Sequence, residues 1–474
     1  MDEVELVEDD WDSPTSTRAP ALDDATPQTP RPPSLLGRRI ARRWWPVPIA
    51  LIAVLVLSDL ATGSVEEREA LAAQKLPQVS APVGPDVEVI DLADDDPRLW
   101  SSEVIAGVRV STTWNENGEQ TLIGSDVDTA DPLWEYTIPL DLSNGGYASN
   151  DCWAEGALLS CWTTVSYYGQ TGDVQSSQTR LLHLDPTTGE VIETQSLEPG
   201  TTVNGDGDLR VTSTSITLQD PERVIAESVD PTDGSVTGTR WETELPALDA
   251  TVPWYPERSV QLTEHAVMVI GPTGGWVLDR EDGHLLGSGM NVRTGREGRF
   301  IVQNDGVLYA LVDGETVELG TGEGLYLHAD DGSVPAAEFL YNQFTGELTA
   351  VDTGTGEQLW VSDHPFRTST SVLLLADMLI GAAPDGLLAL DAQTGQERWS
   401  VPLRAANEWS MLPVTDGRQI LTLVQEDDRT LLLALDRRTG NRVWAAPMPD
   451  DAQQLTVVDH QLYLLRDSTT SLLS

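Results

Sequence analysis

Short apolar runs separated by turn-forming residues make up most of the chain. Beyond about residue 86 these runs have the length and the β-branched content of strands, and Gly, Asp, Asn and Pro stand between them. No long amphipathic helical pattern interrupts the series. Such a pattern is typical of an all-β fold. We therefore expect residues 86–474 to form one β domain.

A motif of apolar residues, Asp, three further residues and Gly recurs in this region. The Asp side chain can accept hydrogen bonds from turn amides, and Gly can adopt the positive φ that closes a tight hairpin. Each copy therefore predicts a hairpin turn after a strand. The six copies run between Asp185 and Gly189, Asp230 and Gly234, Asp279 and Gly283, Asp352 and Gly356, Asp391 and Gly395, and Asp436 and Gly440.

Tryptophans occupy a fixed place after several of these turns. Trp360, Trp399 and Trp444 each follow the motif Asp by eight residues. Trp134 follows Asp126 in the same way, although the Gly is missing there. A large flat side chain at this place on a strand can fill the space between two sheets. We expect these four tryptophans to pack between neighbouring sheets.

The spacing of the motif predicts a β-propeller. Successive motif Asp residues lie 39 to 49 positions apart, except for 73 between Asp279 and Asp352, where the segment around Asp313 fits as a degenerate copy. A period of about 40–50 residues with several strands per unit indicates propeller blades. With the unit at Asp126, we count eight blades, and seven is the alternative. The run Leu462–Leu465 is expected to close the ring with the first blade.

Two runs resemble a known repeat. Gly386–Trp399 and Leu431–Trp444 are similar to the pyrroloquinoline-quinone-type propeller repeat. That superfamily contains quinoprotein alcohol dehydrogenases and also cofactor-free propellers, such as the outer-membrane-assembly lipoprotein. The resemblance implies the propeller fold, and it leaves the function open because one fold supports many functions.

The residues that mark the enzymes of that superfamily are not matched. Those enzymes carry adjacent cysteines against the quinone, a basic residue over it and carboxylates around a calcium ion. Here the two cysteines are nine positions apart, Lys75 is the only lysine, and no acidic set can be aligned. We therefore expect the cofactor-free branch, with no catalytic, cofactor-binding or metal-binding residue.

The six histidines are scattered, and none forms a metal-binding pair at helical spacing. His183 lies in a repeat strand and is expected to be a packing or surface residue rather than a base. The full set is His183, His265, His284, His328, His364 and His460.

Cys152 and Cys161 flank a Glu155-Gly156 turn signal and are expected to face each other in a hairpin. A disulfide between them is favoured, which requires an oxidising compartment. Two alternatives remain open: a pair of reduced core cysteines, or half of a metal site. The metal site is disfavoured because nothing nearby adds two ligands at zinc-like spacing.

Three further segments carry weak signals. Asn204–Asp208 has the alternating oxygen ligands of a calcium loop, but Leu209 stands where an EF-hand needs Gly, so a turn-rich loop is favoured over calcium. Gly320–Gly324 lacks the Lys-Ser or Lys-Thr of a phosphate loop. Asp94–Asp96 is interpreted as a solvated loop.

The N-terminal part has a different composition. Residues 1–37 are acidic and proline-rich, which predicts a disordered cytoplasmic tail. Residues 38–63 combine an arginine cluster with an apolar run, 44–61, and predict a transmembrane signal-anchor; a cleaved signal peptide is the alternative. Residues 64–85 are expected to form a helical turn or two and an extended juxtamembrane linker. The expected protein is single-pass in the cell membrane, with its β domain extracytoplasmic.

Charge narrows the possible partners. The chain has 76 acidic and 28 basic residues, a formal net charge of −48, so phosphate backbones are repelled and nucleic acid is excluded. We expect a non-enzymatic binding or scaffolding module in the cell envelope, whose partner is an envelope protein or a small ligand. A quinoprotein-like dehydrogenase with a divergent site and a ligand-sensing ectodomain are the alternatives.

Overall fold

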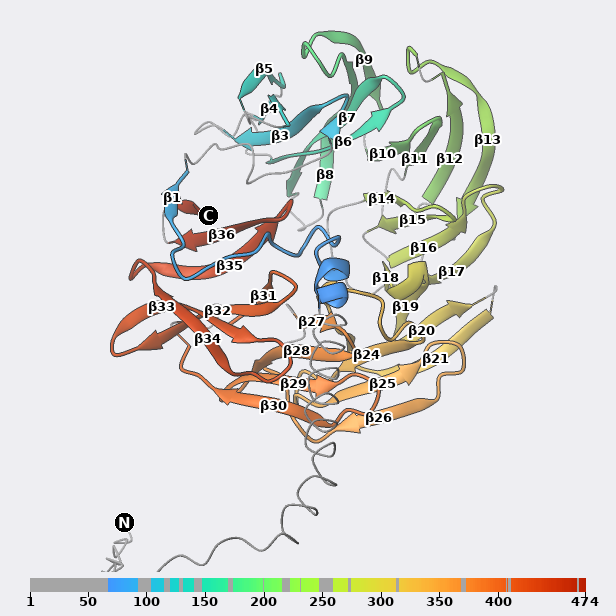
Figure 1. Ribbon diagram of the computed structural model, residues 1–474. Coiled ribbons are helices and arrows are strands. Elements are labelled where there is room, and N and C mark those ends of the chain that lie inside the picture. The colour runs from blue at the N-terminus through green and yellow to red at the C-terminus, as the bar shows by residue number, and fades with distance from the viewer. Residues whose placement is uncertain are drawn as a thin grey trace, which may run out of the picture. The chain divides into compact units, whose positions relative to one another are not determined.

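Nine β-sheets form a ring in the computed structural model (Figure 1), and their strand pairs are antiparallel except for the parallel pair of β23 (Leu327–Asp330) and β27 (Val372–Leu375). The residues that the structure describes are 67–92, 104–114, 120–127, 131–139, 147–168, 174–198, 200–214, 222–230, 232–246, 259–271, 274–312, 315–367, 372–405, 407, 411–466 and 469–474.

Each sheet is one blade, and its strands run in chain order from the innermost to the outermost, except that the outer strand of the last blade comes from the N-terminal part and that one strand of the seventh blade precedes most of the sixth. We number the blades I to IX in chain order.

Blades I to V are formed by β2 (Val104–Ile105), β3 (Val108–Trp114), β4 (Gln120–Asp126) and β5 (Pro132–Thr137); β6 (Tyr147–Glu155), β7 (Leu158–Tyr168), β8 (Val174–Leu184) and β9 (Val191–Leu197); β10 (Thr201–Asp206), β11 (Leu209–Thr214), β12 (Glu222–Val229) and β13 (Val236–Leu245); β14 (Ser259–Leu262), β15 (Ala266–Gly271), β16 (Gly274–Asp279) and β17 (Leu285–Gly289); and β18 (Asn291–Thr294), β19 (Phe300–Asn304), β20 (Val307–Val312) and β21 (Glu315–Thr321).

Blades VI to IX are formed by β22 (Glu323–Gly324), β24 (Ala337–Tyr341), β25 (Leu348–Asp352) and β26 (Gln358–Ser362); β23 (Leu327–Asp330), β27 (Val372–Leu375), β28 (Met378–Ala383), β29 (Gly386–Asp391) and β30 (Glu397–Pro402); β31 (Val414–Thr415), β32 (Gln419–Glu426), β33 (Arg429–Asp436) and β34 (Arg442–Pro447); and β35 (Ala452–Val458), β36 (Gln461–Arg466), β37 (Thr470–Leu473) and β1 (Val89–Asp91). A short 3₁₀ helix, η2 (Arg296–Gly298), joins β18 to β19.

Because neighbouring strands are antiparallel, successive turns alternate between the two faces of the ring. The turns between the first and second strands and between the third and fourth strands share one face, which we call the motif face because the Asp-x-x-x-Gly turns lie there. The turns between the second and third strands, and the links between blades, lie on the other face. We call it the connection face.

The blade count corrects the predicted fold, since nine blades replace the expected eight or seven. Each motif marks the turn between the third and fourth strands of a blade. Blade IX has no such turn, because its outer strand, β1, comes from the other end of the chain and pairs Val89 with Leu473. The predicted closing run, Leu462–Leu465, lies in β36 of this last blade, and β1 closes the ring.

The expected membrane placement also needs correction. Within the described residues no helix is long and apolar enough to cross a membrane. The predicted span, residues 44–61, lies outside the described part of the chain, as do the acidic tail 1–37 and Asp94–Asp96. The structure thus gives the single-pass assignment no support.

The motif turns have the hydrogen bonds that the sequence suggests. Oδ1 of Asp391 accepts the amides of Gln393 (3.0 Å) and Thr394 (2.8 Å), and the Gly395 amide donates to the Asp391 carbonyl (2.8 Å). Gly395 has a φ of +71°. In the turn at Asp352, hydrogen bonding from Thr355 holds the pKa of the Asp carboxyl below its ordinary value.

Tryptophans connect four of the six motif turns to the preceding blade. Nε1 of Trp360, on β26 of blade VI, donates to the Ala392 carbonyl in the turn of blade VII (3.0 Å). A Cβ added to Gly395 would lie 2.6 Å from the Trp360 ring, so the ring occupies the space that only Gly leaves. Trp399 docks in the same way on the turn of blade VIII, where its Nε1 donates to the Arg437 carbonyl (2.9 Å).

Two more interfaces use this contact. Trp134 donates to the Pro186 carbonyl of blade II (2.8 Å), and Trp241, which the motif spacing did not single out, donates to the Arg280 carbonyl of blade IV (3.0 Å). Trp444 is half-buried beside blade IX, which has no motif turn to receive it.

The segment predicted as a linker is packed on the motif face where it is described. Residues 67–73 are helical and lie over the centre of the ring (Figure 1). Ala73 and Val79 are fully buried among strands of blades VII and VIII. Glu69 pairs with Arg437 (2.7 Å) and Arg438 (2.8 Å) in the motif turn of blade VIII.

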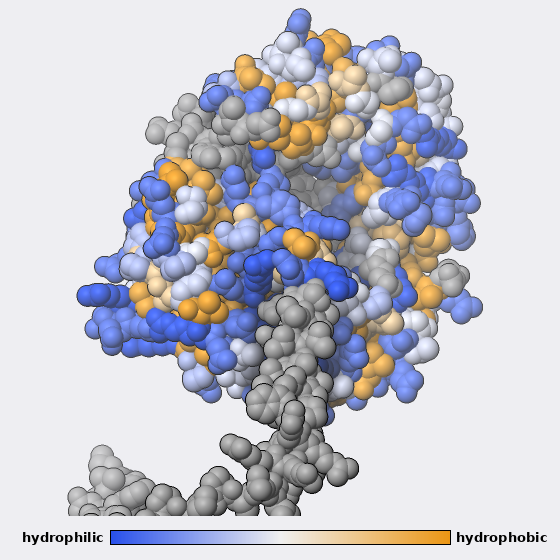
Figure 2. All heavy atoms as spheres, viewed as in Figure 1, coloured by the Kyte–Doolittle hydropathy of each residue, from blue (hydrophilic) through white to orange (hydrophobic). Residues whose placement is uncertain are grey.

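The chain after the helix bonds to first turns of blades VIII and IX. The Ser80 amide donates to the Thr415 carbonyl (2.9 Å), and the Ala81 amide donates to the His460 carbonyl (2.7 Å). Figure 2, which shows the same face as Figure 1, displays a mostly hydrophilic surface with separate apolar patches. The hydrogen bonds of Ser80 and Ala81 thus attach this segment to the ring before the chain reaches β1 of blade IX.

Replacing Trp360 tests the contact between blades. Trp360→Ala is expected to lower the free energy of unfolding by about 3–5 kcal/mol, because it removes a buried ring and its hydrogen bond. Leu359→Ala is the control: Leu359 is 47% exposed on the same strand, and its replacement should change stability by about 0.5 kcal/mol or less. Chemical unfolding measures both, and equal effects would contradict a specific role for the ring.

Two adjacent alanines test the packing of the N-terminal segment. Ala73 is fully buried, whereas Ala72 is exposed. Ala73→Arg should destabilise the ring by about 1–3 kcal/mol through overpacking, and Ala72→Arg should be close to neutral. If thermal unfolding shows no difference between the two variants, residues 67–73 do not pack as described.

Candidate functional site

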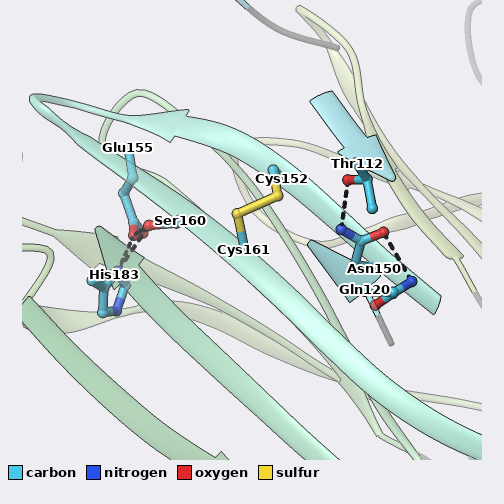
Figure 3. The surroundings of a disulfide bond; sticks show 8 residues. All are labelled: Thr112, Gln120, Asn150, Cys152, Glu155, Ser160, Cys161 and His183. Carbon is cyan, nitrogen blue, oxygen red and sulfur yellow. Dashed lines mark hydrogen bonds and ion pairs between the residues drawn. A yellow bond between two sulfur atoms is a disulfide. The ribbon is translucent and has the colours of Figure 1, made fainter. Parts of the chain in front are cut away.

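A buried polar cluster lies between blades II and III. It consists of Glu155 and Ser160 at the first turn of blade II, His183 on β8 and Arg210 on β11, and all four side chains are at most 4% exposed. Arg210 donates to Glu155 twice, from Nε to Oε1 and from Nη2 to Oε2, both at 3.0 Å. Figure 3 shows Glu155, Ser160 and His183 turned toward one another.

The cluster contains the residue types of a hydrolase triad, but its hydrogen bonds prevent His183 from accepting a proton from Ser160. The Ser160 hydroxyl donates to Glu155 and lies 2.8 Å from Nδ1 of His183. Since the hydroxyl proton is engaged by Glu155, Nδ1 of His183 must carry a proton and donate to Ser160. His183 then cannot accept the Ser160 proton as a general base would.

Burial supports a structural role for this cluster. It lowers the pKa of His183, an effect that Glu155 opposes and Arg210 reinforces, so the ring is neutral near pH 7. Arg210 also donates to the Gly234 carbonyl in the motif turn of blade III (2.8 Å). At this interface Glu193 stands opposite His183, at the place where blades I and VII have Trp134 opposite Gly124 and Trp399 opposite Ala389. The ionic cluster therefore holds the turn that a tryptophan holds elsewhere.

The predicted disulfide is confirmed. Cys152 and Cys161 face each other across β6 and β7, with their Cα atoms 4.1 Å apart (Figure 3). In the same hairpin, Asn150 joins blade II to blade I, because it donates to Thr112 Oγ1 (2.9 Å) and accepts from Gln120 Nε2 (3.4 Å).

The suspected calcium loop forms a turn between β10 and β11. Asp206 pairs with Arg280 (2.8 Å) and Asp208 with Arg240 (2.7 Å), so the two carboxylates point to different partners. A polar cavity of about 410 Å³ adjoins Asn204 and Asp206. Among the described residues, no three His, Cys, Asp or Glu side chains are grouped as a metal site would require.

The other sequence signals fall at separate places. Gly320 lies in strand β21 with a φ of +122° rather than before a helix. His328 is partly buried, which lowers its pKa, and His364 lies 3.4 Å from Glu397. His460 Nδ1 is 2.9 Å from the Val79 carbonyl, in the packing of the N-terminal segment.

A groove on the connection face was not anticipated from the sequence. It has a volume of about 690 Å³ and opens to solvent between the links that enter and leave blade VII. Pro384, Leu403 and Met411 form apolar parts of its wall. Its charged lining residues are Arg367, Asp385 and Arg404. These residues come from three loops, so no local pattern signals them.

An exposed aromatic side chain lies in the turn that is hydrogen-bonded to the loop carrying Arg367 of the groove. Phe344 is 90% exposed at the tip of the turn Asn342–Gly346 in blade VI. Oδ1 of Asn342 accepts the Phe344 amide (2.9 Å), which fixes the turn. The Phe366 amide donates to the Gly346 carbonyl (3.1 Å), so this turn adjoins the residue next to Arg367.

Residues 345–471 match the protein family described as outer membrane protein assembly factor BamB. The match covers less than half of the chain. A comparison with curated proteins finds no match.

Two solved structures resemble the chain at low sequence identity. BamB from Moraxella catarrhalis is 18% identical, with 84% of this chain and 97% of that chain covered and a TM-score of 0.35. A quinohemoprotein alcohol dehydrogenase from Pseudomonas putida HK5 is 13% identical, with 86% and 81% covered and a TM-score of 0.37. At these scores neither resemblance decides between a binding protein and an enzyme.

The buried cluster predicts a pH dependence of stability. Because the pKa of His183 is lowered in the folded state from its ordinary value of 6.5, the unfolded chain binds more protons below that pH. Stability should therefore fall as the pH drops below about 6.5. His183→Gln should make the decline between about pH 7.5 and pH 5.5 shallower, as measured by urea unfolding. Equal slopes would show that folding does not lower the pKa of His183.

Proposed function

We propose that this propeller is a non-enzymatic module that binds a protein partner on its connection face. The observation that carries the proposal is the exposed Phe344, whose turn is hydrogen-bonded to the loop that carries Arg367 of the groove. An aromatic side chain held by a fixed turn loses little entropy on binding, and such residues dominate the energy of protein interfaces.

The remaining chemistry of the described residues supports a binding role. The cluster at Ser160 and His183 is sealed from solvent, and its hydrogen bonds hold two blades together. The described part of the connection face offers an open groove and an exposed apolar side chain, which suit a macromolecular partner better than a small enclosed substrate.

Affinity capture tests the proposal. The full-length tagged protein should recover one protein reproducibly from crosslinked cells of its native host. Phe344→Ser should reduce the recovery about tenfold, because it removes an aromatic anchor. Leu359→Ser is the matched control, since Leu359 is exposed on an outer strand away from the groove, and its recovery should equal that of the unchanged protein.

Activity assays test the enzymatic alternative. The purified protein is expected not to oxidise alcohols when pyrroloquinoline quinone, calcium and an electron-accepting dye are supplied. Dye reduction that depends on the quinone would contradict the proposed function.

A further inference from the structure

The groove on the connection face carries an unusual charge arrangement for so acidic a protein. The side chains of Arg367 and Arg404 are exposed at its wall, and neither forms an ion pair among the described residues. Carboxylates outnumber basic groups by 76 to 28 in this chain. Two guanidinium groups that line the same groove without a carboxylate partner are therefore available to a ligand.

Other arginines of the ring show the contrast. Arg223 pairs with Glu242 (2.7 Å) although both side chains are about half exposed, and Arg466 pairs with both Asp91 and Asp451. Asp385 is the acidic residue in the groove lining, so the lining keeps an excess of positive charge.

The backbone that carries the two arginines is held by hydrogen bonds. The Arg367 amide donates to the Ala382 carbonyl (2.8 Å), and the Gln425 amide donates to the Arg404 carbonyl (2.9 Å). The Leu403 amide donates to the Asp385 carbonyl (3.0 Å) and joins the two walls. The positions from which the guanidinium groups extend are thus fixed before a ligand arrives, which lowers the entropy cost of binding.

We propose that this groove binds an extended peptide segment of the partner, with a carboxylate between Arg367 and Arg404 and apolar residues against Leu403 and Met411. Guanidinium groups bind carboxylates through paired, charge-assisted hydrogen bonds. The groove is open along the surface, as an extended chain requires. The inference rests on the proposed function and specifies the chemistry of the partner.

The charge of the whole ring limits the ligand further. A strongly acidic peptide would be repelled by the surrounding carboxylates, and a basic one would bind at many places. A single acidic residue flanked by apolar residues meets attraction at the two arginines and little repulsion elsewhere. The groove therefore selects a short motif with one carboxylate.

A phage-displayed library of random heptapeptides tests the inference on the full-length protein. Selected peptides should carry one Asp or Glu beside apolar residues. Synthetic copies labelled with fluorescein should bind about tenfold more weakly to Arg367→Glu and to Arg404→Glu, as measured by fluorescence anisotropy. Arg404→Lys should lie between, because Lys keeps the charge and loses the paired geometry.

Lys75→Glu is the control, because Lys75 is exposed in the N-terminal segment on the motif face and the charge change is the same. Its affinity should match that of the unchanged protein. The inference is overturned if the library yields no binders, if the binders lack a carboxylate, or if both arginine variants bind them as well as Lys75→Glu does.

The outcomes separate this inference from the proposed function. If a protein partner is captured through Phe344 but its recovery is unaffected by Arg367→Glu combined with Arg404→Glu, the groove is not the peptide site and the binding function stands. If no partner is captured and no peptide is selected, both proposals fail.

Discussion

Four interfaces of the ring depend on the contact between a tryptophan of one blade and the motif turn of the next. The hydrogen bonds within a blade do not determine how far it lies from the next blade, so contacts between blades must fix that distance. Trp360 and Trp399 do this with a flat ring over the motif Gly and an Nε1 hydrogen bond to the turn. Gly395 and Gly440 are required because any side chain there would occupy the volume of the indole.

The interface between blades II and III shows how a motif turn is held by other residues. Where no tryptophan is present, Arg210 reaches the carbonyl of Gly234, and Glu155 neutralises its charge. Burying an ion pair gains little net stability unless its hydrogen bonds are completed. Ser160 and His183 complete the hydrogen bonds of this ion pair, which explains why residue types common in catalysis lie buried here. This interface keeps the contact with a motif turn, but an arginine makes it in place of a tryptophan.

The sequence predicted the propeller because its repeat is local. Asp391 and Gly395 are four positions apart and specify a turn without help from the rest of the fold. Blade IX was missed because its outer strand is contributed by residues 89–91, so the motif turn does not exist there. Trp241 was missed because register shifts between β12 and β13 move it out of the regular spacing.

Contacts between residues far apart in the sequence could not be predicted from the repeat. The disulfide between Cys152 and Cys161 was predictable because both lie in one hairpin. Arg210 and Glu155, by contrast, are 55 positions apart, and only the packing of two blades brings them together. The groove is formed by three loops, and none of them contains a motif that would predict it. The proposed binding function therefore rests on surfaces that the repeat motif does not predict.

Site-specific photocrosslinking at Phe344 tests the binding account most directly. The photoreactive amino acid benzoylphenylalanine would replace Phe344 in one strain and Leu359 in another, and both strains of the native host would be irradiated. Our account predicts one discrete protein adduct from position 344 and none from position 359, because the partner lies on the connection face of blades VI and VII. Absence of an adduct at 344, or the same adducts at both positions, would contradict it.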